Sequence, residues 1–263
     1  MFYTTADYPA DWPDARIYIL SDLHIGDAQS DPAQVQERID RIASDPHGLC
    51  VLNGDLLNTA TRNSISDIYS EVLPPMEQIR LAVGMLRPIA KKIIAADTGN
   101  HEQRVYKADG VDMMRLVCRE LGVEKRYSPE GVLCFLRFGQ KTPHEHGGGK
   151  RCGKLMYVIY ATHGTGGGRK EGAKAIRLAD MANIVDADIY IHSHTHLPMS
   201  LRQAYHRVDT RNQVVMKVDK LFVNDAASLK YGGYGQAGEF KPSSMCSPVI
   251  HLGGVNKTMN GMM

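Results

Sequence analysis

The chain has 263 residues, of which 43% are hydrophobic and 7% are aromatic. This composition excludes a disordered or low-complexity protein, because a chain of this length and hydrophobicity can bury a large core without disulfides or a structural metal. Lys and Arg number 31 and Asp and Glu 29, and the resulting net charge of +2 excludes a polycation or an acidic tail. We expect one domain over residues 1–263.

The five cysteines are an odd number without a CxxC pair: Cys50, Cys118, Cys134, Cys152 and Cys246. They predict neither a disulfide framework nor a zinc knuckle, and they fit a reducing compartment. The first residues carry acids and prolines where a signal peptide would have a basic and then an apolar stretch. The longest apolar run, Leu155–Ala161, is far shorter than the roughly 18 residues that span a bilayer. We therefore expect a cytoplasmic protein that does not contact a membrane.

Short β-rich segments alternate with helical ones at the start of the chain. The pattern predicts strand, helix, strand, helix and strand at Arg16–Leu20, Ala33–Ala43, Leu49–Leu52, Met76–Ala90 and Lys92–Ala96. This alternation is typical of a mostly parallel sheet with helices packed outside it, where ligands gather at the carboxyl ends of the strands.

The rest of the chain is predicted to add a second set of strands. In order, we expect a helix, two strands, a helix and a strand at Val111–Leu121, Val132–Phe138, Leu155–Thr162, Ala173–Ile184 and Asp188–His192. Beyond these, we expect a β-hairpin of Met199–Asp209 and Val214–Val223 and a last strand at Pro248–Leu252. The pattern as a whole favours two sheets with helices on their outer faces.

Two glycine-rich segments, Gly139–Gly153 and Gly164–Gly172, lack an apolar period and are expected to be loops. They lie in Lys141–Arg177, a stretch with eight basic and two acidic residues and a net charge of +6, so the rest of the chain sums to −4. Such a stretch would attract a polyanion such as nucleic acid. A solvated pair of loops is the alternative interpretation.

Side chains that bind metals follow five of the predicted strands at the point where each strand ends. They are Asp22, His24, Asp55, Asn100, His163, His194 and His196. Residues i and i+2 of an extended backbone point the same way, so we expect Asp22 and His24 to face one ion. Seven oxygen and imidazole donors exceed what one ion takes from a protein, whereas a bridging carboxylate lets two ions sit roughly 3.5 to 4 Å apart. These donors favour Mn, Fe, Zn or similar ions.

These blocks resemble the calcineurin-like metallophosphoesterase superfamily, whose pattern is D-x-H, G-D, G-N-H-[DE], H and G-H-x-H, in the same order. The resemblance implies an α/β fold, a four-layer αββα sandwich of two mixed sheets. It also implies a dinuclear centre with two divalent ions per chain, Mn first and Fe, Zn or Ni as alternatives. The implied ligands of one ion are Asp22, His24 and His196, those of the other are Asn100, His163 and His194, and Asp55 bridges.

In the chemistry that the resemblance implies, a water or hydroxide between the ions attacks phosphorus in line. His101 would then protonate the leaving oxygen. A helix N-terminal residue paired with Glu102 is the alternative interpretation of His101. Arg104 is a candidate for binding a phosphate oxygen, and a salt-bridged position on a helix face is its alternative.

The sequence departs from the family pattern at two positions. Ser193 stands where the family usually has Gly, and the neighbouring His192 is assigned to the strand rather than to the ligands. Asn58 stands where many members have a second acid that orients the proton-donating histidine. Because an amide can accept a hydrogen bond from an imidazole N–H, Asn58 is a candidate to support His101 and to line the substrate site.

The hypothesis that these observations favour is a metal-dependent phosphodiesterase acting on a nucleotide or nucleic acid. It combines the complete ligand set with the basic stretch Lys141–Arg177, which flanks His163 on both sides. A phosphomonoesterase with the same metals is the first alternative, and a non-catalytic scaffold that retains the metal site is the second. The sequence predicts no oligomeric state.

Overall fold

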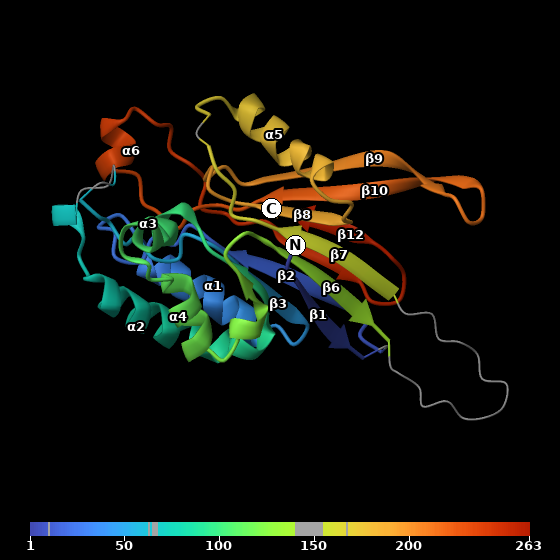
Figure 1. Ribbon diagram of the computed structural model, residues 1–263, viewed down its shortest axis with the longest axis horizontal. Coiled ribbons are helices and arrows are strands. Elements are labelled where there is room, and N and C mark those ends of the chain that lie inside the picture. Colours follow the sequence, from blue (N-terminus) through green and yellow to red (C-terminus); the bar gives the residue numbers. More distant parts are fainter. Residues whose placement is uncertain (10, 63, 65–67, 140–154, 167) are drawn as a thin grey trace.

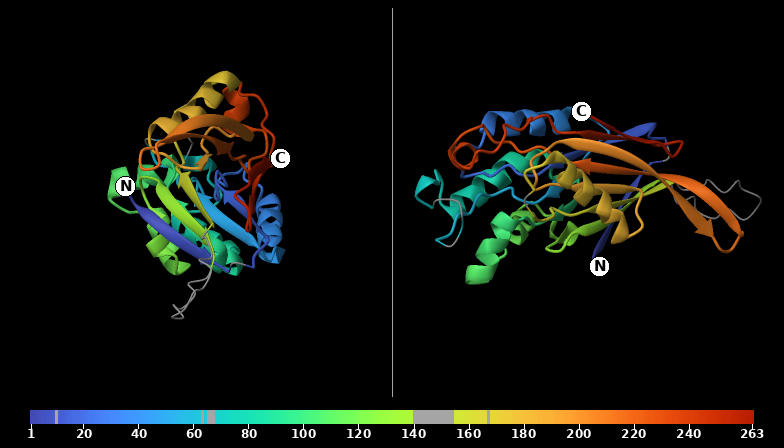
Figure 2. Two further views of the ribbon diagram at one scale, coloured as in Figure 1. Left: turned by 90° about the vertical axis from the view of Figure 1, so that its right-hand side faces the viewer. Right: turned by 90° about the horizontal axis from the view of Figure 1, so that it is seen from above.

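The structure, a computed structural model, describes residues 1–9, 11–62, 64, 68–139, 155–166 and 168–263. Two six-stranded sheets stack face to face, and helices cover both outer faces (Figure 1). The end-on view in Figure 2 shows α5 on one outer face and α1 to α4 on the other. The predicted αββα sandwich of two mixed sheets is therefore confirmed.

The first sheet has the order β12-β11-β2-β3-β4-β5. Its strands are β2 (Asp14–Leu20), β3 (Gly48–Asn53), β4 (Ile93–Asp97), β5 (Tyr127–Ser128), β11 (Val249–Gly253) and β12 (Met259–Met262). The strands from β2 to β5 are parallel, while β11 and β12 are antiparallel to their neighbours. The loops after β2, β3 and β4 consequently leave from one edge of this sheet.

The second sheet has the order β1-β6-β7-β8-β10-β9. Its strands are β1 (Tyr3–Tyr8), β6 (Val132–Phe138), β7 (Leu155–Ala161), β8 (Ile189–His192), β9 (Met199–Asp209) and β10 (Val214–Asn224). Strands β7, β8 and β10 are parallel to one another, so their carboxyl ends also meet at one edge. Strands β9 and β10 form the predicted hairpin.

Three apolar clusters hold the four layers together. The helices α1 (Pro32–Ser44), α2 (Pro75–Leu86), α3 (Asn100–Asp109) and α4 (Met113–Glu120) bury one cluster against the first sheet. A second cluster, which includes Ile17, Val51 and Ile159, fills the space between the sheets. In the third, Leu178 of α5 (Glu171–Asp180) packs with Tyr190 and Phe222. Every residue of β3 and β4 is buried, because helices cover one face of these strands and the second sheet covers the other.

The helix that was expected over Met76–Ala90 is shorter than predicted. It ends at Leu86 and continues as a 3-10 helix, η2 (Arg87–Lys92). Pro88 explains the change, because proline has no N–H and its ring clashes with the carbonyl one turn earlier in an α-helix.

Several elements had no counterpart in the predictions. The edge strand β1 is polar and largely exposed, and it pairs in parallel with β6, which is distant in sequence. Helix α3 buries only Glu102 and Val105, so it has little apolar period to detect. Strand β12, the two-residue β5 and the short helix α6 (Gly233–Ala237) carry similarly weak patterns.

The two glycine-rich loops are described only in part. Of the first, Gly139–Gly153, all but Gly139 lies outside the described residues, as do Lys141, Lys150, Arg151 and Lys154. In the second, the described residues 164–166 and 168–170 form neither helix nor strand, and α5 begins at Glu171. None of the helices formed by the described residues is long and apolar enough to cross a membrane. The four described cysteines are free, and Cys152 lies outside this part of the chain.

Candidate metal centre

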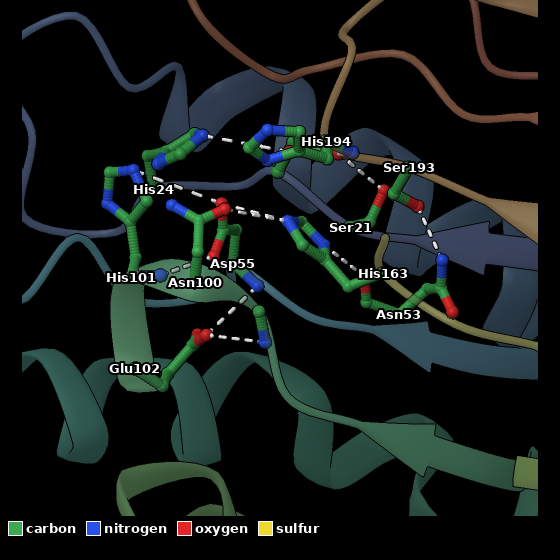
Figure 3. Close-up of polar contacts among 12 residues, drawn as sticks. Ser21, His24, Asn53, Asp55, Asn100, His101, Glu102, His163, Ser193 and His194 are labelled. Atoms are coloured by element: carbon green, nitrogen blue, oxygen red, sulfur yellow. Dashed lines mark hydrogen bonds and ion pairs between the residues drawn. The ribbon is translucent and has the colours of Figure 1, made fainter. Parts of the chain in front are cut away.

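The polar residues that follow the parallel strands converge where the two sheets meet at their common edge (Figure 3). Their ligand atoms form three groups, and within each group all atoms lie within 4.8 Å of one another. The groups are Asp22, His24 and His196; Asp55, His163 and His194; and His24, Asp55 and His101. Asp55 and His24 each belong to two groups, so the three form one continuous cluster.

Five of these residues adopt a left-handed backbone that non-glycine residues rarely use. Their φ angles are 49° at Asp22, 46° at His24, 50° at Asp55, 63° at His194 and 54° at His196. Each such residue costs of order 1–3 kcal/mol, and such strain clusters at functional sites. The prediction that Asp22 and His24 lie on extended backbone is therefore wrong, although both side chains reach the same group.

Hydrogen bonds between neighbouring loops hold this backbone in place. The N–H of Asp22 donates to the carbonyl of Gly54 at 3.1 Å, and the N–H of His24 donates to the carbonyl of Asp55, also at 3.1 Å. The loop after β2 thus runs beside the loop after β3 as a continuation of the sheet. This pairing compensates the strain and carries the ligands of both loops to one place.

The first group, of Asp22, His24 and His196, is compact. His196 Nε2 lies 3.1 Å from Asp22 Oδ1 and 3.4 Å from His24 Nε2. Asp22 Oδ1 is buried and accepts no hydrogen bond from the described residues. Burial opposes ionisation of Asp22, but the neighbouring His196 outweighs it and holds the pKa of Asp22 below its ordinary value. A carboxylate oxygen and two ring nitrogens that face one another are a donor set that fits a divalent transition metal.

The second group is built around Asp55. Its Oδ2 lies 3.1 Å from His163 Nε2, which in turn lies 3.3 Å from Asn100 Oδ1. The rings of His163 and His194 meet edge to face, with centroids 5.4 Å apart. Burial lowers the pKa of His194 to about 4, so its ring is neutral at physiological pH and has a nitrogen lone pair for a metal. The predicted set of seven ligands is thus brought together, while its division between two ions stays a prediction.

His101 lies on the other side of Asp55, at the N-terminus of α3. Its Nδ1 lies 2.9 Å from the carbonyl oxygen of Asn58, and its Nε2 lies 3.9 Å from Asp55 Oδ2. A carbonyl can only accept, so Nδ1 carries a proton and Nε2 is the atom that faces the cluster. Burial lowers the pKa of His101.

The side chain of Asn58 differs from its predicted role. Its Nδ2 donates to Glu71 Oε1 at 3.1 Å, and the residue is only 2% exposed. Its amide oxygen accepts no hydrogen bond from the described residues, so the expected contact with His101 is absent. The backbone carbonyl of the same residue accepts from His101 instead, because the loop after β3 turns this carbonyl towards α3. Substrate contact by Asn58 stays a prediction, and its burial does not favour it.

Arg104 follows His101 by about one helical turn. Its Nε donates to the carbonyl of His101 at 3.3 Å, the side chain is half-buried, and this burial lowers its pKa. The structure thus places a guanidinium close to the cluster, while its contact with a substrate stays a prediction.

Glu102 is a structural residue of the site that the sequence interpretation missed. It does not pair with the His101 ring, which was the alternative considered. Its carboxylate accepts three backbone N–H bonds, from Asp55 and Gly99 at 3.0 Å (Figure 3) and from Leu57 at 2.9 Å. Burial and the charge of Asp55 raise the pKa of Glu102 to about 7. The signal available in the sequence was the acid three residues after Gly99, which is the spacing of a capping box.

Asn53 and Ser193 form a second support that was missed. Asn53 Nδ2 donates to Ser193 Oγ at 2.6 Å, and the Asn53 carbonyl lies 2.8 Å from His163 Nδ1 (Figure 3). The second contact fixes the ring of His163 so that Nε2 faces Asp55, as an outer partner of a metal ligand does. The hydroxyl of Ser193, where the family usually has Gly, is therefore used to join the two sheets. His192, as predicted, lies in β8, and its Nδ1 contacts Asn224 Oδ1 at 2.9 Å.

The sequence model of the calcineurin-like phosphoesterases matches residues 15–198 of the chain, which include every residue of the cluster. The chain belongs to this family. A search of curated proteins gave no match.

Solved structures of low sequence identity are similar to the chain. A predicted phosphoesterase from Streptococcus pneumoniae is 14% identical, with 95% of this chain and 98% of that chain covered and a TM-score of 0.37. Zinc-bound Vps29 from Entamoeba histolytica is 12% identical, with coverage of 94% and 97% and a TM-score of 0.37. GAP50, titled the anchor in the inner membrane complex of Plasmodium, is 11% identical, with coverage of 91% and 81% and a TM-score of 0.39.

Family membership and the three donor groups together support a hydrolase that uses divalent metal. The donors are carboxylate, amide and imidazole groups, which suit ions of the Mn, Fe and Zn type. Four residues of the cluster are buried, Asp22, His24, Asp55 and His163, whereas Asn100, His101, His194 and His196 are half-buried. The cluster therefore opens to solvent between the N-terminus of α3 and the loop after β8.

Proposed function

We propose that this member of the family is a dinuclear, metal-dependent phosphodiesterase that acts on a nucleotide or nucleic acid. The observation that carries the proposal is the position of Asp55. Its carboxylate is shared by a group with His163 and His194 and a group with His24 and His101. A carboxylate between two sets of nitrogen donors is suited to bridge two ions.

Each residue of the cluster has a role in this proposal. Asp22, His24 and His196 would hold one ion, Asn100, His163 and His194 the other, and Asp55 both. Two bound ions would lower the pKa of a water between them and polarise the phosphate. Mn is the ion expected first, with Fe, Zn or Ni as alternatives.

His101 would supply the proton that the leaving oxygen needs. The carbonyl of Asn58 fixes the ring so that Nε2 faces Asp55 and the opening of the cluster. A protonated Nε2 can donate to the oxygen that leaves phosphorus and take a proton back from solvent afterwards. The half-buried position of His101 allows both contacts.

A nucleotide or nucleic acid is favoured as substrate by charge. The stretch Lys141–Arg177 is strongly basic and flanks His163 in the sequence, and Arg104 contacts the carbonyl of His101. Cations around a phosphoesterase site increase the local concentration of polyanionic substrates.

The test is hydrolysis of bis(p-nitrophenyl) phosphate and p-nitrophenyl phosphate with added Mn. We expect the wild-type chain to prefer the diester and Asp55→Asn to lower kcat/KM by at least about 100-fold. Replacing a residue that only hydrogen-bonds a metal ligand already lowers activity by about 10- to 100-fold, and replacing a ligand itself should lower it further. Asp109→Asn, an exposed acid at the end of α3, is the matched control and should not change the rate.

Two other results would contradict the proposal. Preference for the monoester would indicate a phosphomonoesterase with the same metals. Turnover of neither ester, by protein shown to hold two Mn ions per chain, would favour a scaffold that has kept its metal site.

A further inference from the structure

A lysine from α5 lies against the loop that carries two of the candidate ligands. Lys174 Nζ donates to the carbonyl of Thr195 at 2.8 Å. Thr195 is the residue between His194 and His196, and all three residues of this loop are half-buried. The ammonium therefore contacts the backbone of the half-buried loop that carries His194 and His196.

The hydrogen bonds of Lys174 leave it able to bind an anion. An ammonium has three N–H donors. Among the described residues, only the Thr195 carbonyl accepts from Lys174, and this oxygen belongs to the backbone rather than to a donor group of the cluster. Two donors thus remain beside the cluster, on a half-buried side chain held at one place.

The two described arginines of the basic stretch, Arg169 and Arg177, form hydrogen bonds outside the loop of His194 and His196. Arg169 donates to the carbonyl of Gly238 at 3.0 Å and lies over the ring of Phe240, 4.9 Å from its centroid. Arg177 donates to the carbonyl of Thr165 at 2.6 Å. These two arginines attach the segment around α5 to its neighbours, whereas Lys174 contacts the ligand loop.

We propose that Lys174 binds a second phosphate of the substrate, next to the one that is cleaved. The scissile phosphate would bind at the donor groups. Lys174 Nζ is not one of these groups, but it contacts Thr195, the residue between His194 and His196. The preferred substrate is then a phosphodiester with a neighbouring phosphate, as in a nucleic-acid strand, rather than an isolated diester. This inference rests on the proposed function and deepens it.

A purely structural role for Lys174 makes different predictions. If it only holds the Thr195 loop in place, its loss disturbs His194 and His196 and impairs all substrates and metal binding alike. If it binds a flanking phosphate, its loss impairs only substrates that carry one.

The experiment compares Lys174→Met with Lys241→Met. Lys241 is exposed, and its Nζ lies 2.7 Å from the carboxylate of Glu171, the first residue of α5. Its replacement therefore also removes one positive charge close to the helix that carries Lys174. Binding of a labelled single-stranded oligonucleotide is measured by fluorescence anisotropy over a range of salt, in the Asp55→Asn background to prevent cleavage. Turnover of bis(p-nitrophenyl) phosphate and Mn affinity by calorimetry are measured in the otherwise wild-type chain.

We expect Lys174→Met to bind the oligonucleotide about tenfold more weakly, with the salt slope reduced by about one. Turnover of the isolated diester and Mn affinity should stay within about twofold of wild type, because no donor of the cluster is lost. Lys241→Met should bind the strand with nearly unchanged affinity, because exposed ion pairs contribute little.

Three results would overturn the role of Lys174: an equal loss of diester turnover and Mn affinity, a binding loss no larger than that of Lys241→Met, or no binding of the strand by the parent protein. Failure of the proposed function is distinguishable, because it appears as absence of turnover in the wild-type chain. The binding comparison of Lys174→Met with its control still decides the inference in that case.

Discussion

Hydrogen bonds from three backbone N–H groups to Glu102 fix the position of Asp55, a candidate metal ligand. The loop after β3 and the N-terminus of α3 bring three N–H groups to one buried carboxylate, from Asp55, Leu57 and Gly99. Buried N–H groups without acceptors are costly, so this carboxylate stabilises a loop that otherwise has strained backbone at Asp55. Glu102 is thus a positioning residue for Asp55, which bridges the two ions in the proposed function.

Glu102→Gln tests this role. In Glu102, one carboxylate oxygen accepts from Leu57 and the other accepts from Asp55 and Gly99. An amide has only one acceptor oxygen, so in the variant one of these two sets of N–H groups would face an NH₂ group. We expect the free energy of unfolding to fall by about 1–3 kcal/mol, measured by urea denaturation.

Glu120→Gln, at the exposed end of α4, is the control for Glu102→Gln and should leave stability within about 0.5 kcal/mol of wild type. Equal stability of the two variants would show that the three N–H bonds to Glu102 do not need a carboxylate.

At the scale of elements, α3 and the loop after β3 approach each other closely. A Cβ on Gly99 would lie 2.0 Å from Asp55 Oδ1, and a Cβ on Gly54 would lie 2.5 Å from the Gly99 nitrogen. Gly99 has a φ of −97°, which any residue can adopt, so space rather than conformation requires glycine there. The helix can start beside the Asp55 carboxylate only because this position has no side chain.

Gly99→Ala is expected to displace Asp55 or the start of α3. Overpacking of this kind costs about 1–3 kcal/mol of stability, and we expect a Mn affinity at least about tenfold lower, measured by calorimetry.

Gly84→Ala in α2 is the matched control for Gly99→Ala. A Cβ at Gly84 meets no atom within 4 Å, so the replacement should raise stability by about 0.5–1 kcal/mol. Normal Mn affinity of Gly99→Ala would contradict the argument from space.

At the scale of the whole molecule, one buried acid joins the helical layer to the first sheet. Asp45 follows α1 and accepts hydrogen bonds from Arg16 and Tyr18 of β2, the latter at 2.9 Å, while its carbonyl accepts from Lys92 of η2. Burial opposes ionisation of Asp45, but the hydrogen bonds from Arg16 and Tyr18 outweigh it and lower its pKa to about 2. The ionised form therefore stabilises the fold.

This link predicts how stability depends on pH. A carboxyl with a lowered pKa stabilises fully above its ordinary value near 4, and the stabilisation is lost as the pH falls through about 2. Asp45→Asn should therefore lower the free energy of unfolding at pH 7 by about 2 kcal/mol. Urea denaturation from pH 7 to pH 2 should show the two proteins converging in acid. A difference that does not shrink would indicate that packing, not the charge of Asp45, accounts for the loss.

Much of the architecture was available from the sequence, because it depends on local patterns. The alternation of β-rich and helical segments predicted β2, β3 and β4 with their helices, and the segments Met199–Asp209 and Val214–Val223 predicted the β9–β10 hairpin. The pattern failed for β1 and α3, whose exposed faces carry little apolar period. Their places are set by partners that are distant in the sequence or by the site itself, as with β6 for β1.

The sequence by itself determined the chemical nature of the site. Carboxylate, amide and imidazole donors follow strands that run parallel, and parallel strands must bring their carboxyl ends to one edge. The identity and order of the candidate ligands, and with them the family, therefore needed no coordinates.

Only the tertiary structure decided how those donors are held. It showed the left-handed backbone of Asp22 and Asp55, the Asn58 carbonyl in place of its amide, and the support from Glu102. The physical reason is that each of these features is a contact between loops of different strands or helices. His24 and His196, for example, meet across 172 residues of chain. Local sequence patterns carry no information on which backbone group a distant loop will face.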